Sequence, residues 1–312
     1  MFYSPLRYPG GKNKLSAFIA KICVDNNING HYIEAYAGGA SVALFLLLEG
    51  YVNQITINDK DRSIYAFWYS VLNYPSELCE KIRTCEISIE NWLIQKKIQQ
   101  NKAIANLLDL GFSTLFLNRT NRSGIITGGV IGGIGQTGGY KINCRFNKEE
   151  IINRIEKIAA KKDNIRLYEK DAIDLIDIIE TDLNDENVIF YFDPPYYFKA
   201  SSLYMSHYKK EHHLFVSNRI KRIKNIKWIV SYDNVKEIRE LYSDCPQKEY
   251  SFKHTAYEAR EGKEVLFFSQ NIVQPDIQNW EPLNFKLRKT KNGKEITYKK
   301  NKKKLIQSAE SV

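Results

Sequence analysis

An unbroken apolar run at residues 188–192 leads directly into Asp193-Pro194-Pro195-Tyr196. The run consists of β-branched and aromatic residues and ends at a proline turn, which predicts a fully buried central strand of an α/β sheet. The four residues would then lie at the carboxyl end of that strand. Open α/β sheets bind their ligands at this edge, so we expect Asp193 and Tyr196 to take part in binding or chemistry rather than in packing.

The order of these four residues suits chemistry on the exocyclic amino group of a nucleobase. That nitrogen is a poor nucleophile, and Asp193 and the carbonyl group of Pro194 can accept its two hydrogens. The two prolines have fixed φ angles, so both acceptors are held in place before a substrate arrives. The ring of Tyr196 offers a face on which a base that has left its helix can stack. The alternative is an ordinary proline turn that Asp193 starts and Tyr196 borders.

Two further segments predict a nucleoside site at the same edge. Residues 32–41 form a short strand that ends in a turn with Gly38-Gly39, and an apolar helix at 42–48 follows. Glycines let the backbone approach a ligand closely, and a helix start offers free N–H groups. A second strand at 54–58 ends at Asp59, about twenty residues after the glycines, where an acid commonly holds a ribose. A glycine turn alone is typical of ordinary connections, but all three features together indicate a cofactor site.

These segments, in this order, resemble the Dam-type DNA adenine methyltransferases, which use S-adenosylmethionine as methyl donor. The likeness extends over about residues 5–270, and an ordered set of motifs is far more specific than any one of them. The matching segments are 6–12, 34–41, 58–59, 117–124, 145–147 and 193–196. The resemblance implies an α/β fold, a doubly wound Rossmann-like methyltransferase sheet with a mainly helical target-recognition insert.

The resemblance also implies roles for individual residues. Asp193 would touch both the cofactor and the target amino group, and Asp171, after a third strand, would meet the cofactor adenine. Two positions depart from the family pattern, since Ala40 replaces a last glycine and Tyr8-Pro9 stand where relatives often carry Trp and Ala. Gly10-Gly11-Lys12 is similar to the end of a phosphate-binding loop, but that loop's first glycine and preceding strand are missing. The residues expected in the cofactor site are Tyr8, Gly10, Lys12, Glu34, Tyr36, Ala37, Gly38, Gly39, Asp59, Asp171 and Asp193.

The segment between the second strand and Arg145 has the character of an insert. Helical periodicity runs through 63–117 without strand-like alternation. The stretch 124–139 then holds eight of the seventeen glycines. Its Gly-x-Gly-x-x-Gly at 133–138 lacks the strand and helix of a dinucleotide site, so we expect a glycine-rich loop within a hairpin that becomes ordered against DNA.

Arginine and asparagine side chains around this loop are of the types that meet phosphates and base edges, and the resemblance implies that this region recognises the target. Arg suits guanine and Asn suits adenine, but the sequence assigns no base to any of them. The alternative for Asn118 and Arg119 is a structural brace between the insert and the catalytic domain. The residues expected to contact DNA are Asn118, Arg119, Asn121, Arg122, Lys141 and Arg145.

Nearly all of the net charge of +10 lies near the end of the chain, because 285–304 contain ten of the 46 Lys and Arg residues and a single acid, Glu295. Asn292-Gly293 predicts a two-residue hairpin that sets Leu287 opposite Tyr298. We expect a disordered Lys-rich end at 299–304. Such a segment suits non-specific contact with phosphates, and a solubilising tail is the alternative.

At 312 residues with 43% apolar content, the chain can bury a substantial core. Further strands are predicted at 227–233 and 264–269, with a helix between them at 234–242. The polar aromatic stretch 197–204 is expected to close over a flipped base, and a surface connection is the alternative. The expected division is a catalytic domain at 1–62 and 148–274, the target-recognition insert at 63–147 and a basic tail at 275–312.

The sequence argues against a membrane, a metal or disulfides. No apolar run approaches membrane-spanning length, and the first residues do not have the pattern of a signal peptide. The five cysteines show no paired metal spacing and are predicted to be reduced thiols. His212-His213 has no supporting cysteines or carboxylates, which favours a solvated pair at a helix start over a metal site.

Together these expectations describe an enzyme that binds double-stranded DNA, flips an adenine, and methylates its amino group by direct attack without a covalent intermediate. Three alternatives stay open: amino-group methylation of cytosine in DNA, methylation of RNA or protein amides, where the leading acid is more often Asn, and an inactive DNA-binding regulator on the same scaffold. GATC is the recognition sequence that the resemblance suggests first. We expect a cytoplasmic monomer of bacterial or phage origin that acts beside a restriction endonuclease or alone.

Overall fold

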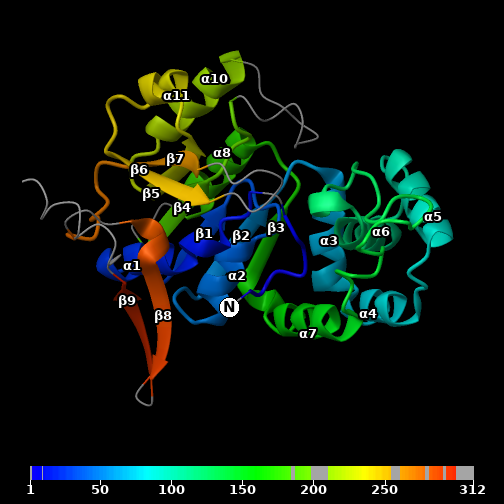
Figure 1. Cartoon of the computed structure of the whole chain (residues 1–312). Helices are drawn as coiled ribbons and strands as arrows, with labels where there is room; N and C mark the ends of the chain where they lie inside the picture. The colour runs from blue at the N-terminus through cyan, green and yellow to red at the C-terminus, as the bar shows by residue number, and fades with distance from the viewer. Residues whose placement is uncertain are drawn as a thin grey trace, which may run out of the picture.

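The computed structural model describes residues 2–8, 10–183, 187–197, 210–253, 261–277, 281–290 and 293–299. At their centre is a seven-stranded sheet with the order β3-β2-β1-β4-β5-β7-β6 (Figure 1). β1 to β5 pair in parallel, and β7 runs antiparallel between β5 and β6. The strands are β1 His31–Glu34, β2 Gln54–Asn58, β3 Ile165–Tyr168, β4 Val188–Phe192, β5 Lys227–Asp233, β6 Gln247–Lys253 and β7 Glu261–Phe268.

The direction in which the sheet grows reverses between β1 and β4. β1 pairs with β2 on one side and with β4 on the other, so Glu34 at the end of β1 lies opposite both Ile57 and Tyr191. The carboxyl ends of these three strands therefore meet at one edge. A reversal of strand order opens the crevice in which open α/β sheets bind ligands. The predicted doubly wound sheet is confirmed.

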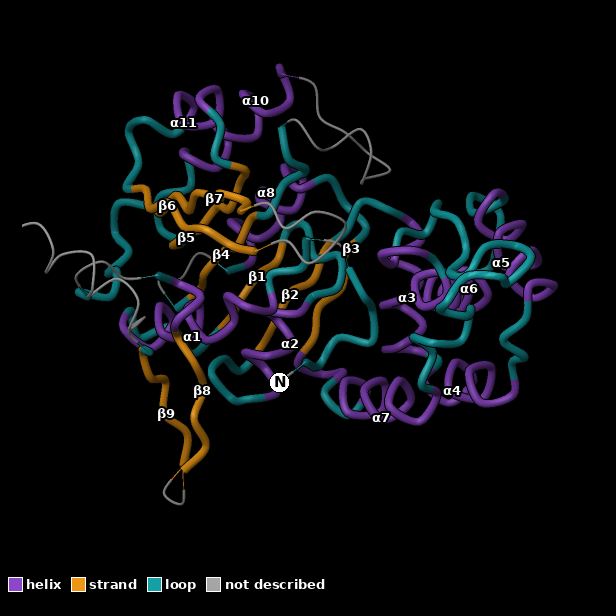
Figure 2. The backbone as a smooth tube through the Cα atoms, viewed as in Figure 1, coloured by secondary structure: helices purple, strands orange, loops and turns teal. Residues whose placement is uncertain are grey.

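Helices cover both faces of the sheet (Figure 2). α1 and α2 pack on the face to which Tyr32 and Ile189 belong, and α8, α10 and α11 pack on the face of Ile33 and Phe190. Neighbouring residues of one strand thus serve opposite cores, which is why β1 and β4 are buried throughout. The bounds are α1 Ser16–Asp25, α2 Ser41–Leu48, α8 Ala172–Asp182, α10 Lys210–Lys221 and α11 Lys236–Leu241.

Four helices, α3 to α6, lie beside the β3 edge of the sheet (Figure 1). Side chains of Asp61, Ser88 and Asn106 cap α3, α5 and α6 by accepting a backbone N–H of the first turn. The helical character predicted for 63–117 is confirmed. α7 belongs to the predicted catalytic segment, but it packs against α3 and α4 of the predicted insert. The domain division therefore stays a prediction. The bounds are α3 Arg62–Asn73, α4 Pro75–Thr84, α5 Ile89–Gln100, α6 Leu107–Thr120 and α7 Lys148–Ala159.

The glycine-rich stretch after α6 consists mainly of turns. The expected hairpin is limited to one β-bridge between Asn121 and Val130. Gly124 has a φ of +77°, and a Cβ there would lie 2.1 Å from the carbonyl oxygen of Arg7, so only glycine fits against the N-terminal segment. The 3₁₀ turns are η1 Asn13–Leu15, η2 Arg122–Gly124, η3 Lys162–Asn164 and η4 Pro282–Asn284.

The basic hairpin, β8 Phe285–Thr290 and β9 Gly293–Tyr298, packs against α1. The predicted register is wrong, because Leu287 lies opposite Ile296 and Tyr298 lies opposite Phe285. Phe285 is buried between Tyr298 and Phe18 of α1, with ring centroids 5.0 and 5.5 Å away, and this aromatic contact fixes the register.

Two lysines of the hairpin share one carboxylate partner, that of Glu49. Lys294 Nζ lies 2.6 Å from Glu49 Oε2, and Lys289 Nζ lies 3.5 Å from Glu49 Oε1. These contacts tie the hairpin to the residue that follows α2. Residues 300–304 of the Lys-rich end, and residues 198–204 of the stretch expected to close over a base, lie outside the described residues.

Candidate active site

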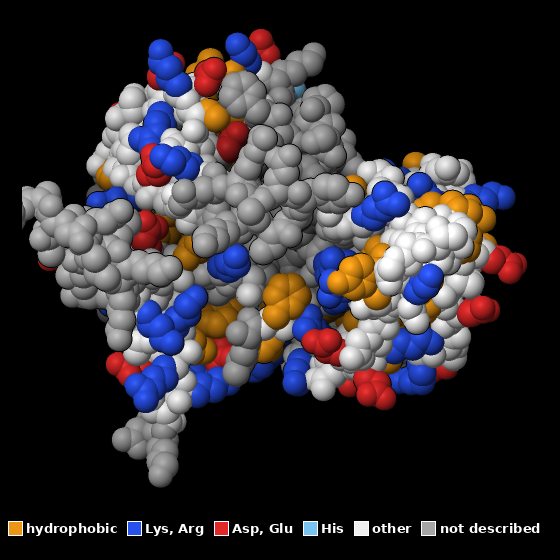
Figure 3. Space-filling model, viewed as in Figure 1, with side chains coloured by type: hydrophobic (Ala, Val, Ile, Leu, Met, Phe, Trp, Pro, Cys, Tyr) orange, Lys and Arg blue, Asp and Glu red, His pale blue; other side chains and the backbone are white. Residues whose placement is uncertain are grey.

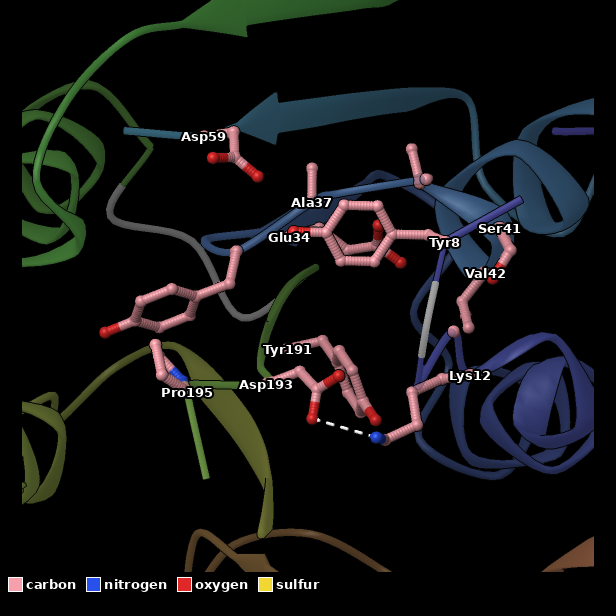
Figure 4. A pocket seen from close by; sticks show the side chains of 14 residues that line it. Tyr8, Lys12, Glu34, Ala37, Ser41, Val42, Asp59, Tyr191, Asp193 and Pro195 are labelled. Carbon is pink, nitrogen blue, oxygen red and sulfur yellow. Dashed lines mark ion pairs between the residues drawn. The ribbon is translucent and has the colours of Figure 1, made fainter. Parts of the chain in front are cut away.

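One pocket opens at the carboxyl edge of β1, β2 and β4 (Figure 4). Its empty volume is about 640 Å³, including the part open to solvent. Eight of the eleven residues expected in the cofactor site line it, together with Pro195. The lining residues are Tyr8, Gly11, Lys12, Glu34, Tyr36, Ala37, Gly39, Ala40, Ser41, Val42, Asp59, Tyr191, Asp193 and Pro195.

Lys12 is a buried cation that contacts the carboxylate at the end of β4 (Figure 4). Its Nζ lies 3.1 Å from Asp193 Oδ1 and 3.4 Å from Glu264 Oε1. It also donates to the hydroxyl of Tyr196 at 2.6 Å. Burial alone would lower the pKa of Lys12, but the carboxylates of Asp193 and Glu264 outweigh it and raise that pKa well above its ordinary value. Lys12 therefore stays charged in the pocket.

Asp193 has one carboxylate oxygen engaged by the protein. Ser231 donates to Oδ1 at 2.7 Å, and Lys12 approaches the same atom. Among the residues that the structure describes, both polar contacts of this carboxylate are made by Oδ1, while the side chain remains 19% exposed. Burial raises the pKa of Asp193, and the charge of Lys12 opposes this rise. Within the described residues, Oδ2 therefore has no polar contact from the protein.

The glycine turn after β1 is held from two sides. Gly38 has a φ of +46°, and a Cβ there would lie 2.6 Å from Cε1 of the Tyr8 ring, so this position requires glycine. Trp68 of α3 donates its indole N–H to the Gly38 carbonyl at 2.9 Å. Asp59 Oδ2 accepts the Gly38 N–H at 2.9 Å. Helix α3 and the acid after β2 therefore fix the turn together.

Two acids of the pocket have pKa values raised to the range near pH 7–8. Burial raises the pKa of Glu34 to about 8, although Glu34 Oε1 accepts the N–H of Ala43 at 3.0 Å and the hydroxyl of Tyr32 at 3.2 Å. Burial likewise raises the pKa of Asp59 to about 7. Acids in this state ionise readily beside a positively charged ligand.

The raised pKa of Glu34 predicts how the stability of the free protein depends on pH. An unfolded Glu34 ionises above its ordinary pKa of 4.5, whereas the folded protein keeps it protonated up to about pH 8. The folded state therefore binds more protons in this window, and the free energy of unfolding falls as pH rises through it. Glu34→Gln should reduce this slope in urea unfolding measured from pH 5 to 8.5. An unchanged slope would contradict the assignment.

Ala40, the departure from the glycine pattern, adopts the left-handed conformation, with φ 46° and ψ 35°. This conformation is strained for any residue with a Cβ. Ala40→Gly should raise the free energy of unfolding by about 0.5–1 kcal/mol, measured by urea unfolding with an unchanged m value. Ala43→Gly, inside α2, is the matched control and should lower it by about 1 kcal/mol or more. A destabilised Ala40→Gly variant would show that the strain is absent.

The structure gives the Tyr196 hydroxyl contacts that the sequence did not predict. Its side chain is only 6% exposed, and its hydroxyl donates to Glu264. The ammonium group of Lys12 lies 5.0 Å from the ring centroid and 2.6 Å from the hydroxyl, so it sits at the hydroxyl end of the ring. The Tyr196 hydroxyl thus joins Lys12 to β7, and stacking of a base on the ring face stays a prediction.

Three expected cofactor residues lie outside the pocket lining, namely Gly38, described above, Asp171 and Gly10. Asp171 is the N-cap of α8: its Oδ1 accepts the N–H of Ile173 at 3.1 Å, and its Oδ2 lies 2.9 Å from Lys60 Nζ. Asp171 thus has a structural role in the described fold. Gly10 contributes its carbonyl group, which accepts from Lys12 Nζ at 3.2 Å.

Three residues expected to contact DNA are buried braces, which corrects that prediction. Asn118 accepts the N–H of Arg7 at 2.7 Å and donates to the Arg7 carbonyl at 3.1 Å. Arg119 donates Nε–H to the Pro5 carbonyl at 2.8 Å. Asn121 donates to two carbonyl groups of its own loop. These side chains are at most 8% exposed, so base edges cannot reach them.

The other three expected DNA contacts remain candidates, because Arg122, Lys141 and Arg145 are exposed. Lys and Arg side chains gather over the helices α3 to α6 and near the β8–β9 hairpin on the face shown in Figure 3. Lys141 also donates to the Gln136 carbonyl at 2.5 Å, which ties it to the glycine-rich stretch.

Sequence reasoning missed the polar residues that enter the site from strands. Tyr191 lines the pocket, Ser231 holds Asp193, and Glu264 holds Lys12 and Tyr196. A signal was present, since Ser231 interrupts an apolar run and Glu264 directly precedes one. Such residues are costly to bury without partners.

Comparison with known proteins identifies the chain. A family model described as D12 class N6 adenine-specific DNA methyltransferase matches residues 8–259. The chain belongs to this family. The protein is therefore an S-adenosylmethionine-dependent methyltransferase of the Dam-type adenine-specific class. No match was found among curated proteins.

Two solved methyltransferases are similar to this D12-family enzyme at low identity. The rRNA methyltransferase aviRa from Streptomyces viridochromogenes is 8% identical with a TM-score of 0.38, and 84% of this chain and 86% of that one are covered. A precorrin-6y C5,15-methyltransferase from Geobacter metallireducens is 8% identical with a TM-score of 0.33. The match covers 81% of this chain and 87% of that one. At these TM-scores the likeness carries no argument about the site.

The next features are possible metal ligands and the pair His212-His213. The described part of the enzyme holds no group of three or more His, Cys, Asp or Glu side chains suited to a metal ion. His213 is buried rather than solvated, because its Nδ1 bonds to the hydroxyl of Tyr232 at 2.8 Å. Of the helices described, none has the length and apolar character needed to cross a bilayer.

Proposed function

We propose that this enzyme methylates the exocyclic amino nitrogen of adenine in duplex DNA. The observation that carries the proposal is the position of Asp193, which follows β4, borders the pocket, and makes both of its described polar contacts through Oδ1. Pro194 and Pro195 are buried, and their fixed φ angles hold the neighbouring carbonyl group beside the carboxylate. One acceptor from a side chain and one from the backbone match the two hydrogens of an amino group.

The pocket suits S-adenosylmethionine, which carries a sulfonium group and an ammonium group. The lining contains the carboxyl groups of Glu34, Asp59 and Asp193 and one ammonium group, that of Lys12, an arrangement that favours a cationic ligand. The first turn of α2 offers backbone N–H groups to a carboxylate. We propose that Asp59 accepts from ribose hydroxyls. When bound, S-adenosylmethionine supplies the methyl group.

In the proposed reaction, Asp193 and Pro194 orient the amino nitrogen. Asp193 Oδ2 accepts one hydrogen and the Pro194 carbonyl accepts the other, so that the nitrogen lone pair is directed away from both. Asp193 Oδ2 then takes up the proton that the nitrogen gives up. Lys12 holds Oδ1 throughout, which keeps the carboxylate in one orientation and keeps it ionised until it takes up this proton.

We propose that the adenine leaves the duplex to reach this pocket, because the amino group of a paired adenine is engaged inside the helix. Arg122, Lys141 and Arg145 are the proposed phosphate contacts, and their exposure supports this role. The same proposal divides the chain into a catalytic domain and a target-recognition insert. It also places the action of the enzyme in the cytoplasm of a bacterium or a phage-infected cell.

Transfer of isotopically labelled methyl groups tests the proposed acceptor. The enzyme is incubated with labelled S-adenosylmethionine and either unmethylated duplex DNA of mixed sequence or an RNA duplex of the same sequence, and the labelled nucleoside is identified after digestion. Label in deoxyadenosine is expected. Label confined to deoxycytidine or to RNA would support those alternatives, and DNA binding without any transfer would support an inactive regulator.

A further inference from the structure

Glu264 is a buried carboxylate that the proposed reaction does not use directly. It lies on β7, two strands away from β4, and is 4% exposed. Its Oε1 accepts the hydroxyl of Tyr196 and lies 3.4 Å from Lys12 Nζ. Its Oε2 accepts the hydroxyl of Tyr250 on β6. A buried charge in this position requires partners of this kind.

These contacts form a continuous chain from the sheet edge to the site. Tyr250 donates to Glu264, and Glu264 in turn accepts from Tyr196. Lys12 donates to the Tyr196 hydroxyl at 2.6 Å and lies 3.1 Å from Asp193 Oδ1. Without Glu264, the ammonium group of Lys12 would keep Asp193 as its carboxylate partner but lose its second carboxylate contact, which holds it on the Oδ1 side. The ammonium group could then swing towards Oδ2.

We propose that Glu264 is a positioning residue for methyl transfer, which together with Tyr250 ties Lys12 and Tyr196 so that Lys12 engages only Oδ1 of Asp193. This inference rests on the proposed function, in which Oδ2 receives the amino hydrogen. Glu264 itself is separated from the substrate by Lys12 and Tyr196. Its effect is therefore on the geometry and the charge of Asp193.

The charges around this group give the proposal a pH signature. The groups that face Lys12 and Asp193 are Glu34 on β1, Tyr191 and Tyr196 from the β4 segment, Ser231 on β5, Tyr250 on β6 and Glu264 on β7. The charge of Glu264 raises the pKa values of both Asp193 and Lys12. Removing it should lower both pKa values, so both limbs of the activity profile move to lower pH.

The test compares kcat and KM for DNA across pH in the full-length wild type and in Glu264→Gln, Glu264→Asp, Tyr250→Phe and Tyr242→Phe. Tyr242→Phe is the control, because the Tyr242 hydroxyl is buried with no hydrogen-bond partner in the described structure. Glu264→Gln should lower kcat on the order of 10–100-fold with KM nearly unchanged, and should move the profile to lower pH. Tyr250→Phe should lower kcat by a smaller factor, Glu264→Asp should restore the wild-type profile in part, and Tyr242→Phe should match the wild type.

Two outcomes would overturn the positioning role while the wild type methylates DNA. One is a Glu264→Gln profile that superimposes on that of the wild type. The other, which applies even if Glu264→Gln fails to fold, is an equal effect of Tyr250→Phe and Tyr242→Phe. A wild type that transfers no methyl group to DNA would instead refute the proposed function, and this inference with it.

Discussion

Asp193→Ala is expected to lower kcat for DNA methylation by at least about 10³-fold, because it removes both the acceptor of an amino hydrogen and the acceptor of the released proton. The fold should persist, since Lys12 keeps Glu264 and Tyr196 as partners. Single-turnover methyl transfer measures the loss, and gel-shift titration with duplex DNA should give a dissociation constant close to that of the wild type.

Asp171→Asn is the matched control for this prediction. The sequence placed Asp171 in the same site, but in the structure it caps α8, and Asn caps helices equally well. Its kcat should stay within about threefold of the wild type, since no contact with the reacting groups is changed. Activity above a tenth of the wild type in Asp193→Ala, or an equal loss in Asp171→Asn, would contradict the account.

Asn118→Leu is expected to lower the free energy of unfolding by about 2–4 kcal/mol, because it leaves buried backbone groups without partners. The groups affected are the N–H and the carbonyl of Arg7 and the carbonyl of Gly124, which Asn118 bonds at 2.7, 3.1 and 2.8 Å. The change tests whether this residue braces the N-terminal segment or contacts DNA. Urea unfolding measures it, with the midpoint shifting and the m value unchanged.

Arg122→Ala provides the opposite case on the same segment. Arg122 is exposed, so its loss should change the free energy of unfolding by less than about 0.5 kcal/mol. If it contacts a phosphate, the slope of log affinity against log salt should fall by about one unit. A stable Asn118→Leu protein with weakened DNA binding would reverse the assignments of the two residues.

The sequence predicts the central strands well for a physical reason. β4 and β5 are buried on both faces, so they appear as continuous apolar runs whose ends are visible in the sequence. β6, Gln247–Lys253, is an edge strand that pairs only with β7 and carries many polar residues. Its pattern does not differ from that of a loop, and it was not predicted.

The candidate site was predicted where local sequence determines local geometry. The glycine turn with Asp59, and Asp193 after β4, depend on strand ends that short motifs reveal. Asn118 and Arg119 were misassigned because the same donor groups serve a phosphate or a backbone carbonyl equally well. Only the packing of α6 against the N-terminal segment decides between these uses, and that contact joins residues more than a hundred positions apart.

The most direct test of the account is nucleoside analysis, by mass spectrometry, of unmethylated plasmid DNA after incubation with the enzyme and S-adenosylmethionine. The account predicts N6-methyl-2′-deoxyadenosine with the wild type and none with Asp193→Ala. Methylation on cytosine alone, or equal adenine methylation by the two proteins, would contradict it.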